Sequence, residues 1–453
     1  MEGILKLIYG MLITIIIIIS YILSSIFSRA ILIRDKTGGA VDKSIDFISN
    51  DLNGNGNARN NTIDFPILDP VVKTEYTKAF HDVYTAKKKP PISTYNEIDG
   101  SLKYSAEGQS IYTGAYHIGQ RKLILNEIQF LTRVMSGAST PSALIVYAGA
   151  APSNKGALLA SLFPAMKFLL IDPNKFDIRS YGDVIVKHLG VMDDTQTSEN
   201  IIDAAITELK TANICTVRTL MSAAIAEELG KRFAELYFIS DIRTNMISDG
   251  PTTLDILWNS AQHIQWVELM KPRETMLKFR LPFFEESEKE LLQYEKLSHQ
   301  LPYSEAFNSV PRMRAFTSRT FEFYEGDIYL QPWAPISSTE SRLVFKGVPA
   351  LRKYELSEYE DKFFYYNKIL RNYQLYQNPN ADKKLGFDHC VDCALENKIW
   401  TDYCNATGKE CNVKKYVKIL SDLTFRPLLH HYHGKMFGPV PIQILDRRFR
   451  SYK

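Results

Sequence analysis

Residues 144–172 constrain the fold of this chain more than any other stretch. They begin with a short apolar run at 144–147, which is typical of a strand buried on both faces of a parallel sheet. Small residues follow at 148–152, then roughly two turns of mostly apolar helix, then a second apolar run that ends in Asp172. This order predicts the first βαβ unit of a nucleotide-binding α/β domain.

The turn and the terminal acid of this unit indicate the kind of ligand. An acid roughly 20 residues after such a turn is placed to accept hydrogen bonds from a ribose. The turn holds one glycine, Gly149, and lacks the GxGxxG pattern of dinucleotide enzymes. We therefore expect an adenosine ligand without phosphates, such as S-adenosylmethionine. A tight strand–helix turn that binds nothing fits the same residues.

Helical and strand-like patterns alternate through the central region. Helical spacing is found at 119–134, 201–209, 222–233 and 258–269. Strand-like apolar runs are found at 183–186, 235–240, 275–279, 327–331 and 342–345. This alternation predicts an α/β fold with a doubly wound, mostly parallel sheet.

Charged side chains stand where some of these strands should end, at Asp172, Asp241 and Lys278. Ligands of such sheets bind outside the carboxyl ends of the strands. Lys278 interrupts an otherwise apolar strand, which is costly unless the amine is paired or has a lowered pKa. The simpler interpretation is a lysine at a strand edge that extends its amine into water.

Net charge and cysteine content limit the function classes. The formal net charge is only +3, so no overall basic field indicates nucleic acid, and RNA contacts would need local patches. The chain has 5 Cys, too few for a secreted domain held by disulfides, which favours a reducing compartment. The last four form a cluster that predicts either a tetrahedral zinc site or unliganded thiols: Cys390, Cys393, Cys404 and Cys411.

The amino-terminal region predicts a membrane anchor. Residues 4–27 carry one charge, Lys6, and the run exceeds the roughly 20 apolar residues that a spanning helix needs. A signal peptide is the alternative, but the run lacks a good small-residue cleavage site. Arg29, Arg34 and Lys36 follow the run, which places the rest of the chain in the cytoplasm. Residues 31–62, rich in Gly, Asn, Asp and Ser, predict a flexible linker.

A series of short motifs follows a characteristic order between about Ile98 and Asn372. They are 119–122 (GQRK), 147–152 (YAGAAP), 170–172 (LID), 239–243 (ISDIR), 277–283 (LKFRLPF), 330–335 (LQPWAP), 340–343 (ESRL) and 367–372 (NKILRN). In this order they resemble the poxvirus family of cap-specific mRNA (nucleoside-2′-O)-methyltransferases, which also act as processivity subunits of the viral poly(A) polymerase.

The resemblance implies a Rossmann-like, S-adenosylmethionine-dependent methyltransferase from a large DNA virus. The sequence as a whole predicts an anchor at 1–30, a linker at 31–62, a methyltransferase domain at 63–372 and a Cys- and His-containing extension at 373–453. The implied catalytic tetrad is Lys122, Asp241, Lys278 and Glu340. The implied cofactor-binding residues are Gln120, Tyr147, Gly149, Pro152, Asp172, Val191 and Asp241.

The resemblance also implies a pocket for 7-methylguanosine. Tyr104 and Phe283 would stack on the cationic purine, and Glu285 and Glu360 would accept from its N–H groups. The chain departs from the family pattern at several positions. Ser153 replaces a glycine and Asn174 replaces an arginine near the cofactor, and Ser337 replaces a tyrosine near the cap.

These features predict methyl transfer to the ribose 2′-hydroxyl of the first transcribed nucleotide of capped mRNA. The expected partners are capped mRNA, a membrane bound through residues 4–27, and the catalytic subunit of a viral poly(A) polymerase. The enzyme would face the host cytoplasm from a membrane, or reside in the virion. The alternatives are a non-catalytic RNA-binding processivity subunit and a ribose methyltransferase that acts on other RNA.

Overall fold

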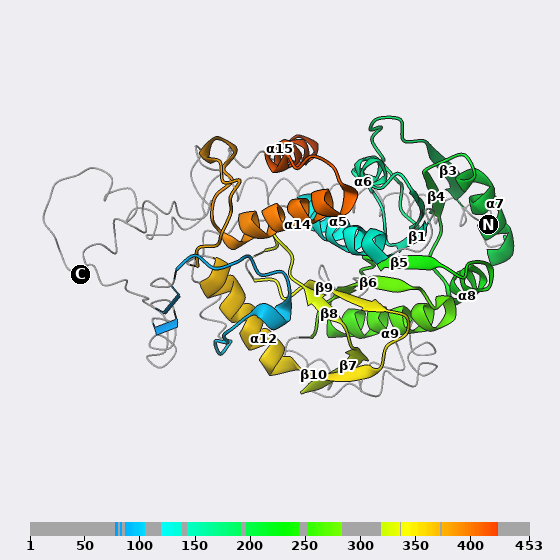
Figure 1. Ribbon diagram of the computed structural model, residues 1–453. Coiled ribbons are helices and arrows are strands. Elements are labelled where there is room, and N and C mark those ends of the chain that lie inside the picture. Colours follow the sequence, from blue (N-terminus) through cyan, green and yellow to red (C-terminus); the bar gives the residue numbers. More distant parts are fainter. Residues whose placement is uncertain are drawn as a thin grey trace, which may run out of the picture. The chain divides into compact units, whose positions relative to one another are not determined.

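Figure 1 shows the chain as a computed structural model. The structure describes residues 78–79, 82–83, 87–104, 119–137, 143–191, 196–244, 252–282, 319–335, 337–371 and 374–424. All of them belong to one unit, Phe65–Lys453. The predicted membrane helix at 4–27 and the predicted linker at 31–62 lie outside the described residues. Within the described ranges, no helix has both the length and the apolar character that a membrane crossing requires.

An eight-stranded sheet in the order β3-β4-β2-β1-β5-β6-β9-β8 forms the centre of this unit. Its strands are β1 (Ala143–Ala148), β2 (Met166–Ile171), β3 (Val186–Val191), β4 (Ile214–Arg218), β5 (Leu236–Ser240), β6 (Glu274–Phe279), β8 (Asp327–Tyr329) and β9 (Ser341–Lys346). Neighbours from β3 to β6 are parallel, whereas β9 is antiparallel to both β6 and β8. The prediction of a mostly parallel sheet is confirmed, and the sheet is mixed at its β8 edge.

Helices on both faces bury the central strands. Every residue of β1 and β5 is buried. The helices beside the sheet are α5 (Gly119–Gly137), α6 (Gly156–Leu162), α7 (Ser198–Leu209), α8 (Ala223–Arg232) and α9 (Thr253–Met270). In Figure 1, α5 lies on one face of the sheet and α9 on the other. Because each buried Val, Leu, Ile or Phe contributes about 1.5–3 kcal/mol, the apolar runs determine where these strands form.

Polar caps fix where the helices begin. The Thr197 hydroxyl accepts from the Asn200 amide at α7, and the Ser222 hydroxyl does so at the start of α8. At α9 the Thr252 hydroxyl accepts from the Asp255 amide, while the Asp255 carboxylate accepts from the Thr252 amide. Such caps contribute about 1 kcal/mol each. They explain why α9 begins earlier than the helix predicted from apolar spacing at 258–269.

Two strands of the eight-stranded sheet differ from the sequence-based prediction. The strand predicted at 183–186 is wrong, because β3 begins at Val186 and continues to Val191. β3 is an edge strand without a single buried residue, so an apolar run is a poor guide to its position. The buried strand β4 was not predicted, although it pairs with both β2 and β3.

Part of the chain after β6 folds outside the eight-stranded sheet. β7 (Thr320–Tyr324) and β10 (Leu351–Glu355) form a two-stranded antiparallel sheet. The helices of this part are α12 (Leu356–Tyr365), α14 (Val391–Thr407) and α15 (Val413–Leu423), and a π-helical turn at Tyr366–Leu370 follows α12. Short 3₁₀ turns occur at Tyr95–Glu97 and Lys383–Leu385.

Helix α14 joins the carboxyl-terminal extension to the sheet domain. It lies beside α5 in Figure 1. The fully buried guanidinium of Arg121 in α5 donates to both carboxylate oxygens of Glu396 in α14, at 2.7 and 2.5 Å. The aromatic rings of Trp400 and Tyr403 are also buried in the same core as the sheet. Residues 374–424 of the extension therefore share the hydrophobic core of the sheet domain.

Candidate active site

A cavity of about 1010 Å³ opens at the carboxyl ends of β1, β2, β5 and β6. The strand order reverses between β1 and β5, because β2 continues the sheet on one side and β6 on the other. The two strand ends lie side by side there, and the Asp241 amide donates to the Ala148 carbonyl at 3.0 Å. Open α/β sheets bind their ligands at such a reversal point.

Four predicted catalytic side chains meet at this cavity. Lys122 comes from α5, Asp241 follows β5, Lys278 lies in β6, and Glu340 precedes β9. Lys122 Nζ lies 2.6 Å from Glu340 Oε1. Lys278 Nζ lies 3.0 Å from Asp241 Oδ1 and 3.6 Å from Glu340 Oε2. The two carboxylates thus hold both ammonium groups within one cluster.

Two arginines complete the cluster and were not predicted as site residues. Arg342 is 1% exposed, and its Nη1 lies 2.8 Å from Asp241 Oδ1. Arg342 stands directly opposite Lys278 in the antiparallel pair of β6 and β9. The half-exposed Arg243 donates to Glu340 Oε2 at 2.5 Å. Four cationic side chains therefore surround two carboxylates.

Burial and charge set the protonation of this cluster. Burial would raise the pKa of Asp241, but the charges of Arg342 and Lys278 outweigh it and lower that pKa to about 2. The pKa of Glu340 is held well below its usual range in the same way: Lys278 and Lys122 overcome the effect of burial. Burial lowers the pKa of Lys122, which Glu340 partly opposes. Both carboxylates are therefore anionic at neutral pH.

The wall around the reversal point fits an adenosine. Gly149 has a φ of +74°, and a Cβ there would lie 2.7 Å from the Ile242 amide nitrogen, so only glycine fits. Asp172 is buried at the end of β2, where its carboxylate accepts from the amides of Ala151 (3.1 Å) and Asn174 (2.8 Å). These bonds orient an acid that faces the cavity, as a ribose contact requires.

The structure brings some predicted cofactor residues to the cavity and not others. Gln120, Gly149, Asp172 and Asp241 line it. Tyr147, Pro152 and Val191 do not, and a cofactor contact at these three residues stays a prediction. The Tyr147 hydroxyl points toward α5 and donates to Glu127 at 2.8 Å, and Pro152 and Val191 are exposed.

The sequence-based prediction did not include an apolar wall of the cavity. Leu220 and Met221 line it from the segment between β4 and α8, and Ile171 lines it from the end of β2. Leu220 is 70% exposed, so its side chain is available to cover an apolar ring system. Strand β4 was not predicted from the sequence. The position of the segment after it, at the carboxyl ends of the strands, was therefore not predicted either.

Two of the four predicted cap-binding residues are described. Tyr104 lines the cavity and contacts Phe364 of α12 edge-on, with ring centroids 5.6 Å apart. Its amide donates to Asp361 Oδ1 at 2.7 Å, one residue from the buried Glu360. Glu360 does not line the cavity. Phe283 and Glu285 lie outside the described residues.

The four clustered cysteines do not meet, so the predicted four-thiol zinc site is wrong. Cys390 and Cys393 lie at the start of α14, and Cys404 lies near its end. With about 1.5 Å of rise per residue, roughly 20 Å of helix separates Cys390 from Cys404. Cys411 lies beyond the end of α14, beside Cys404. The sequence cluster therefore divides into two separate pairs.

The sheet and the cavity define an α/β protein with a Rossmann-like ligand site at the carboxyl ends of a mostly parallel sheet. A family model described as "Poly A polymerase regulatory subunit" matches residues 86–194 and 191–319, about half of the chain. The chain belongs to this family.

The chain is also similar to viral proteins and to one solved structure. A myxoma virus (strain Lausanne) protein named "Cap-specific mRNA (nucleoside-2′-O-)-methyltransferase" is 26% identical over 329 residues, covering 69% of this chain and 80% of that protein. A fowlpox virus (strain NVSL) protein of the same name is 26% identical over 294 residues, covering 62% and 77%. A structure of bluetongue virus VP4, titled "a multifunctional RNA-capping production-line", aligns over 68% of this chain and 45% of the other at 9% identity and a TM-score of 0.30.

Proposed function

We propose that this chain is a viral cap-specific mRNA (nucleoside-2′-O)-methyltransferase. The observation that supports this most directly is the position of Lys278 Nζ, between the carboxylates of Asp241 and Glu340 at the open cavity. A ribose 2′-hydroxyl is a poor nucleophile and must lose its proton as the methyl group transfers. The names of the poxvirus relatives, which match across most of their length, support the same reaction and substrate.

The acidic and small residues at the reversal point fit S-adenosylmethionine. Asp172 would accept from the ribose hydroxyls, and Leu220 and Met221 would cover the adenine. Gly149 lets the chain turn closely where a methionine group would pass. When bound, S-adenosylmethionine supplies an electrophilic methyl group on a sulfonium.

The cluster supplies the base and its orientation. Asp241 and Glu340 are anionic and hold Lys278 so that its Nζ faces the cavity. In its neutral form, Lys278 takes the hydroxyl proton at Nζ. Arg342 and Lys122 contact the same two carboxylates, at 2.8 Å from Asp241 Oδ1 and 2.6 Å from Glu340 Oε1. Base catalysis of this kind contributes about 10²–10⁴-fold.

One assay tests the reaction and its substrate: transfer of labelled methyl from S-adenosylmethionine to 7-methylguanosine-capped and to uncapped RNA. We expect transfer to capped RNA only. We expect Lys278→Ala to lower the rate by about 10²–10⁴-fold, with S-adenosylmethionine affinity by calorimetry nearly unchanged. Lys346→Ala is the matched control, because Lys346 is an exposed lysine of the adjacent strand β9. Near-normal turnover of Lys278→Ala would remove this residue from the mechanism.

The aromatic ring of Tyr104 would stack on 7-methylguanosine. A cation over an aromatic face gains about 0.5–2 kcal/mol, so removal of the ring should weaken binding by roughly 2- to 30-fold. We expect Tyr104→Ala to be retained less on a 7-methylguanosine resin, and Tyr104→Phe, which keeps the ring, to be retained normally. Equal retention of Tyr104→Ala and the unaltered protein would exclude Tyr104 from the cap pocket.

A second function is supported by the family description. The chain would act as a regulatory subunit of a poly(A) polymerase and hold RNA for it, with or without methyl transfer. A chain with this role alone would lengthen poly(A) tails made by the polymerase and would transfer no methyl to any RNA. A ribose methyltransferase for other RNA would instead methylate uncapped transcripts in the assay above.

A further inference from the structure

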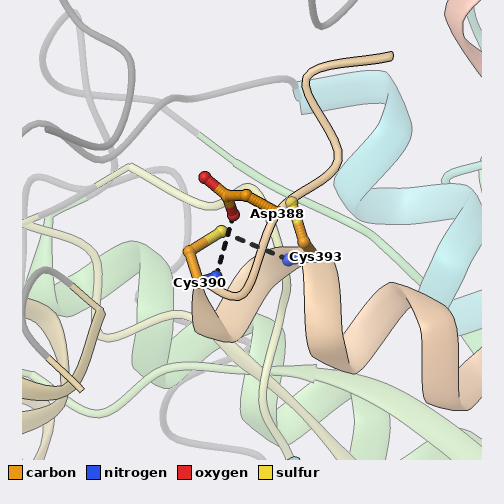
Figure 2. Close-up of side chains that lie close together, drawn as sticks. All are labelled: Asp388, Cys390 and Cys393. Carbon is orange, nitrogen blue, oxygen red and sulfur yellow. Dashed lines mark hydrogen bonds between the residues drawn. The ribbon is translucent and has the colours of Figure 1, made fainter. Parts of the chain in front are cut away.

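Two thiols and a carboxylate converge at the start of α14, outside the active site. Figure 2 shows Asp388, Cys390 and Cys393 with their side chains turned toward one another. Their ligand atoms, one from each residue, all lie within 4.8 Å of one another. Cys390 and Cys393 are buried, and Asp388 is partly exposed at the edge of the group. From this arrangement we propose a metal site that binds a thiophilic divalent cation, with zinc as the expected ion.

The backbone prepares the three side chains for this role. Cys390 is the N-cap of α14, and its Sγ accepts from the Cys393 amide at 3.4 Å. Asp388 Oδ1 accepts from the Cys390 amide at 2.8 Å, which fixes the carboxylate beside the sulfur. The CxxC spacing places both sulfurs on one side of the first helical turn. The three groups are therefore held by the fold and do not depend on an ion to bring them together.

The donor set and the spacing suit zinc. Zinc binds Cys sulfur at about 2.3 Å and carboxylate oxygen at about 2.0–2.2 Å, which places tetrahedral ligand atoms roughly 3.5–3.8 Å apart. The three ligand atoms lie within 4.8 Å of one another, and side-chain rotations would bring them to that distance. Three protein ligands leave a fourth position for water, and the exposed edge at Asp388 is a path for entry.

The charges around the site favour an ion with anionic ligands. When the metal binds, the two thiols lose their protons to solvent, and a divalent ion with two thiolates and one carboxylate carries one net negative charge. The positive end of the α14 dipole stabilises that charge. Two residues beyond Cys390, Asp392 forms an ion pair with Arg371 at 2.9 Å and accepts from the Trp333 amide at 3.2 Å. A metal at the start of α14 would therefore stabilise the helix turn that carries Asp392, through which α14 contacts Arg371 and Trp333.

Metal content of the full-length protein tests the proposal. Protein equilibrated with zinc and then freed of excess should retain close to one equivalent by elemental analysis. Cobalt(II), used as a probe, should give thiolate-to-cobalt charge-transfer absorption. Cys390→Ser and Cys393→Ser should lose both signals. Cys404→Ser is the matched control, because Cys404 is also a buried cysteine of α14 but lies near the other end of the helix.

Asp388→Asn keeps the test decisive if a buried serine prevents folding. Asp388 is only partly buried, so this variant should fold, and its cobalt affinity should fall at least roughly tenfold. The proposal is overturned if the unaltered protein retains no zinc and gives no cobalt charge-transfer band. Retention of metal by Cys390→Ser and Cys393→Ser, or an equal loss in Cys404→Ser, would also overturn it. None of these readouts depends on methyl transfer.

Discussion

His263 lies directly behind Asp241, the aspartate of the proposed catalytic cluster. It is 2% exposed in α9, and its Nε2 lies 2.8 Å from the hydroxyl of Ser240, the residue before Asp241. Burial lowers the pKa of His263 to about 3, and the nearby charges of Lys278 and Arg342 act in the same direction, with Asp241 opposing. The imidazole is therefore neutral at neutral pH and serves as a hydrogen-bonding partner.

The lowered pKa of His263 makes the free energy of unfolding depend on pH. Its unfolded pKa is about 6.5, so between that value and about 3 the unfolded chain binds the extra proton. The stability that the neutral imidazole provides is present above pH 6.5 and is lost as the pH falls, by about 2 kcal/mol near pH 5. We expect His263→Gln, which keeps a polar group without this titration, to lose about 2 kcal/mol less between pH 7 and pH 5. Denaturant unfolding at both pH values measures this difference, and equal losses in the two proteins would contradict it.

Sequence reasoning found the charges of the site that interrupt apolar strands. Lys278 and Asp241 were recognised because a charge within or directly after a buried strand is costly unless it is paired or has a functional role. Arg342 did not stand out, although it lies two residues after Glu340. Its guanidinium reaches Asp241 because β9 runs antiparallel to β6 and places Arg342 opposite Lys278. Strand direction and register depend on long-range pairing, which local residue patterns do not specify.

Among the elements, α14 contacts both α5 and the loop at Trp333, which flank the active site. Its Glu396 holds Arg121, the neighbour of Lys122 in α5, and accepts from Trp333 Nε1 at 2.8 Å. Trp333 has a φ of 62°, an unfavourable conformation for a non-glycine residue. It begins the segment that reaches the cavity at Pro335. One carboxylate of the extension thus fixes both the helix and the loop that flank the cavity.

We expect Glu396→Gln to reduce catalysis through this contact. Loss of one partner from a buried ion pair costs about 3–5 kcal/mol, because Arg121 is left as a buried charge. The catalytic rate should fall with little change in S-adenosylmethionine affinity, since Lys122 moves and the Asp172 side of the cavity does not. Asp402→Asn is the control, because it breaks only the exposed pair with Lys398 in the same helix. Equal rates for Glu396→Gln and Asp402→Asn would show that α14 does not position the site.

The elements that the sequence predicted well are those with a strong local pattern. The βαβ unit around β1 and the helices α5, α7, α8 and α9 were found because apolar periodicity marks their buried faces. Strand β4 is a five-residue run that holds Cys215, Thr216 and Arg218, and it gives a weak signal. Helix α14 buries Asp392, Glu396 and Asn397, so its buried face is partly polar and lacks the usual apolar stripe. Ion pairs with partners far away in the sequence make that burial possible.

At the scale of the whole molecule, the sequence predicts a different surrounding for residues 4–27 than for the described unit. Residues 4–27 are mostly apolar in sequence, and Lys6 is their only charged residue. A helix of that kind is stable when lipid or a protein core surrounds it. The linker composition at 31–62 would let the catalytic unit reach long RNA from a membrane surface.

The membrane anchor is therefore a prediction for the full-length chain. We expect the intact protein expressed in cells to stay in the membrane fraction after an alkaline carbonate wash, because roughly 20 apolar residues in lipid hold it far more firmly than surface charge does. A variant that lacks residues 1–30 should be released into the supernatant and should keep its methyl-transfer rate, since the cavity is built from residue 104 onward.

A variant with Ile15, Ile17 and Ile19 each changed to Lys tests the span without shortening the chain. It should also be released, because each lysine at the centre of a bilayer costs about 2.5–3.5 kcal/mol. Release of the unaltered protein by carbonate would show that residues 4–27 do not span a membrane.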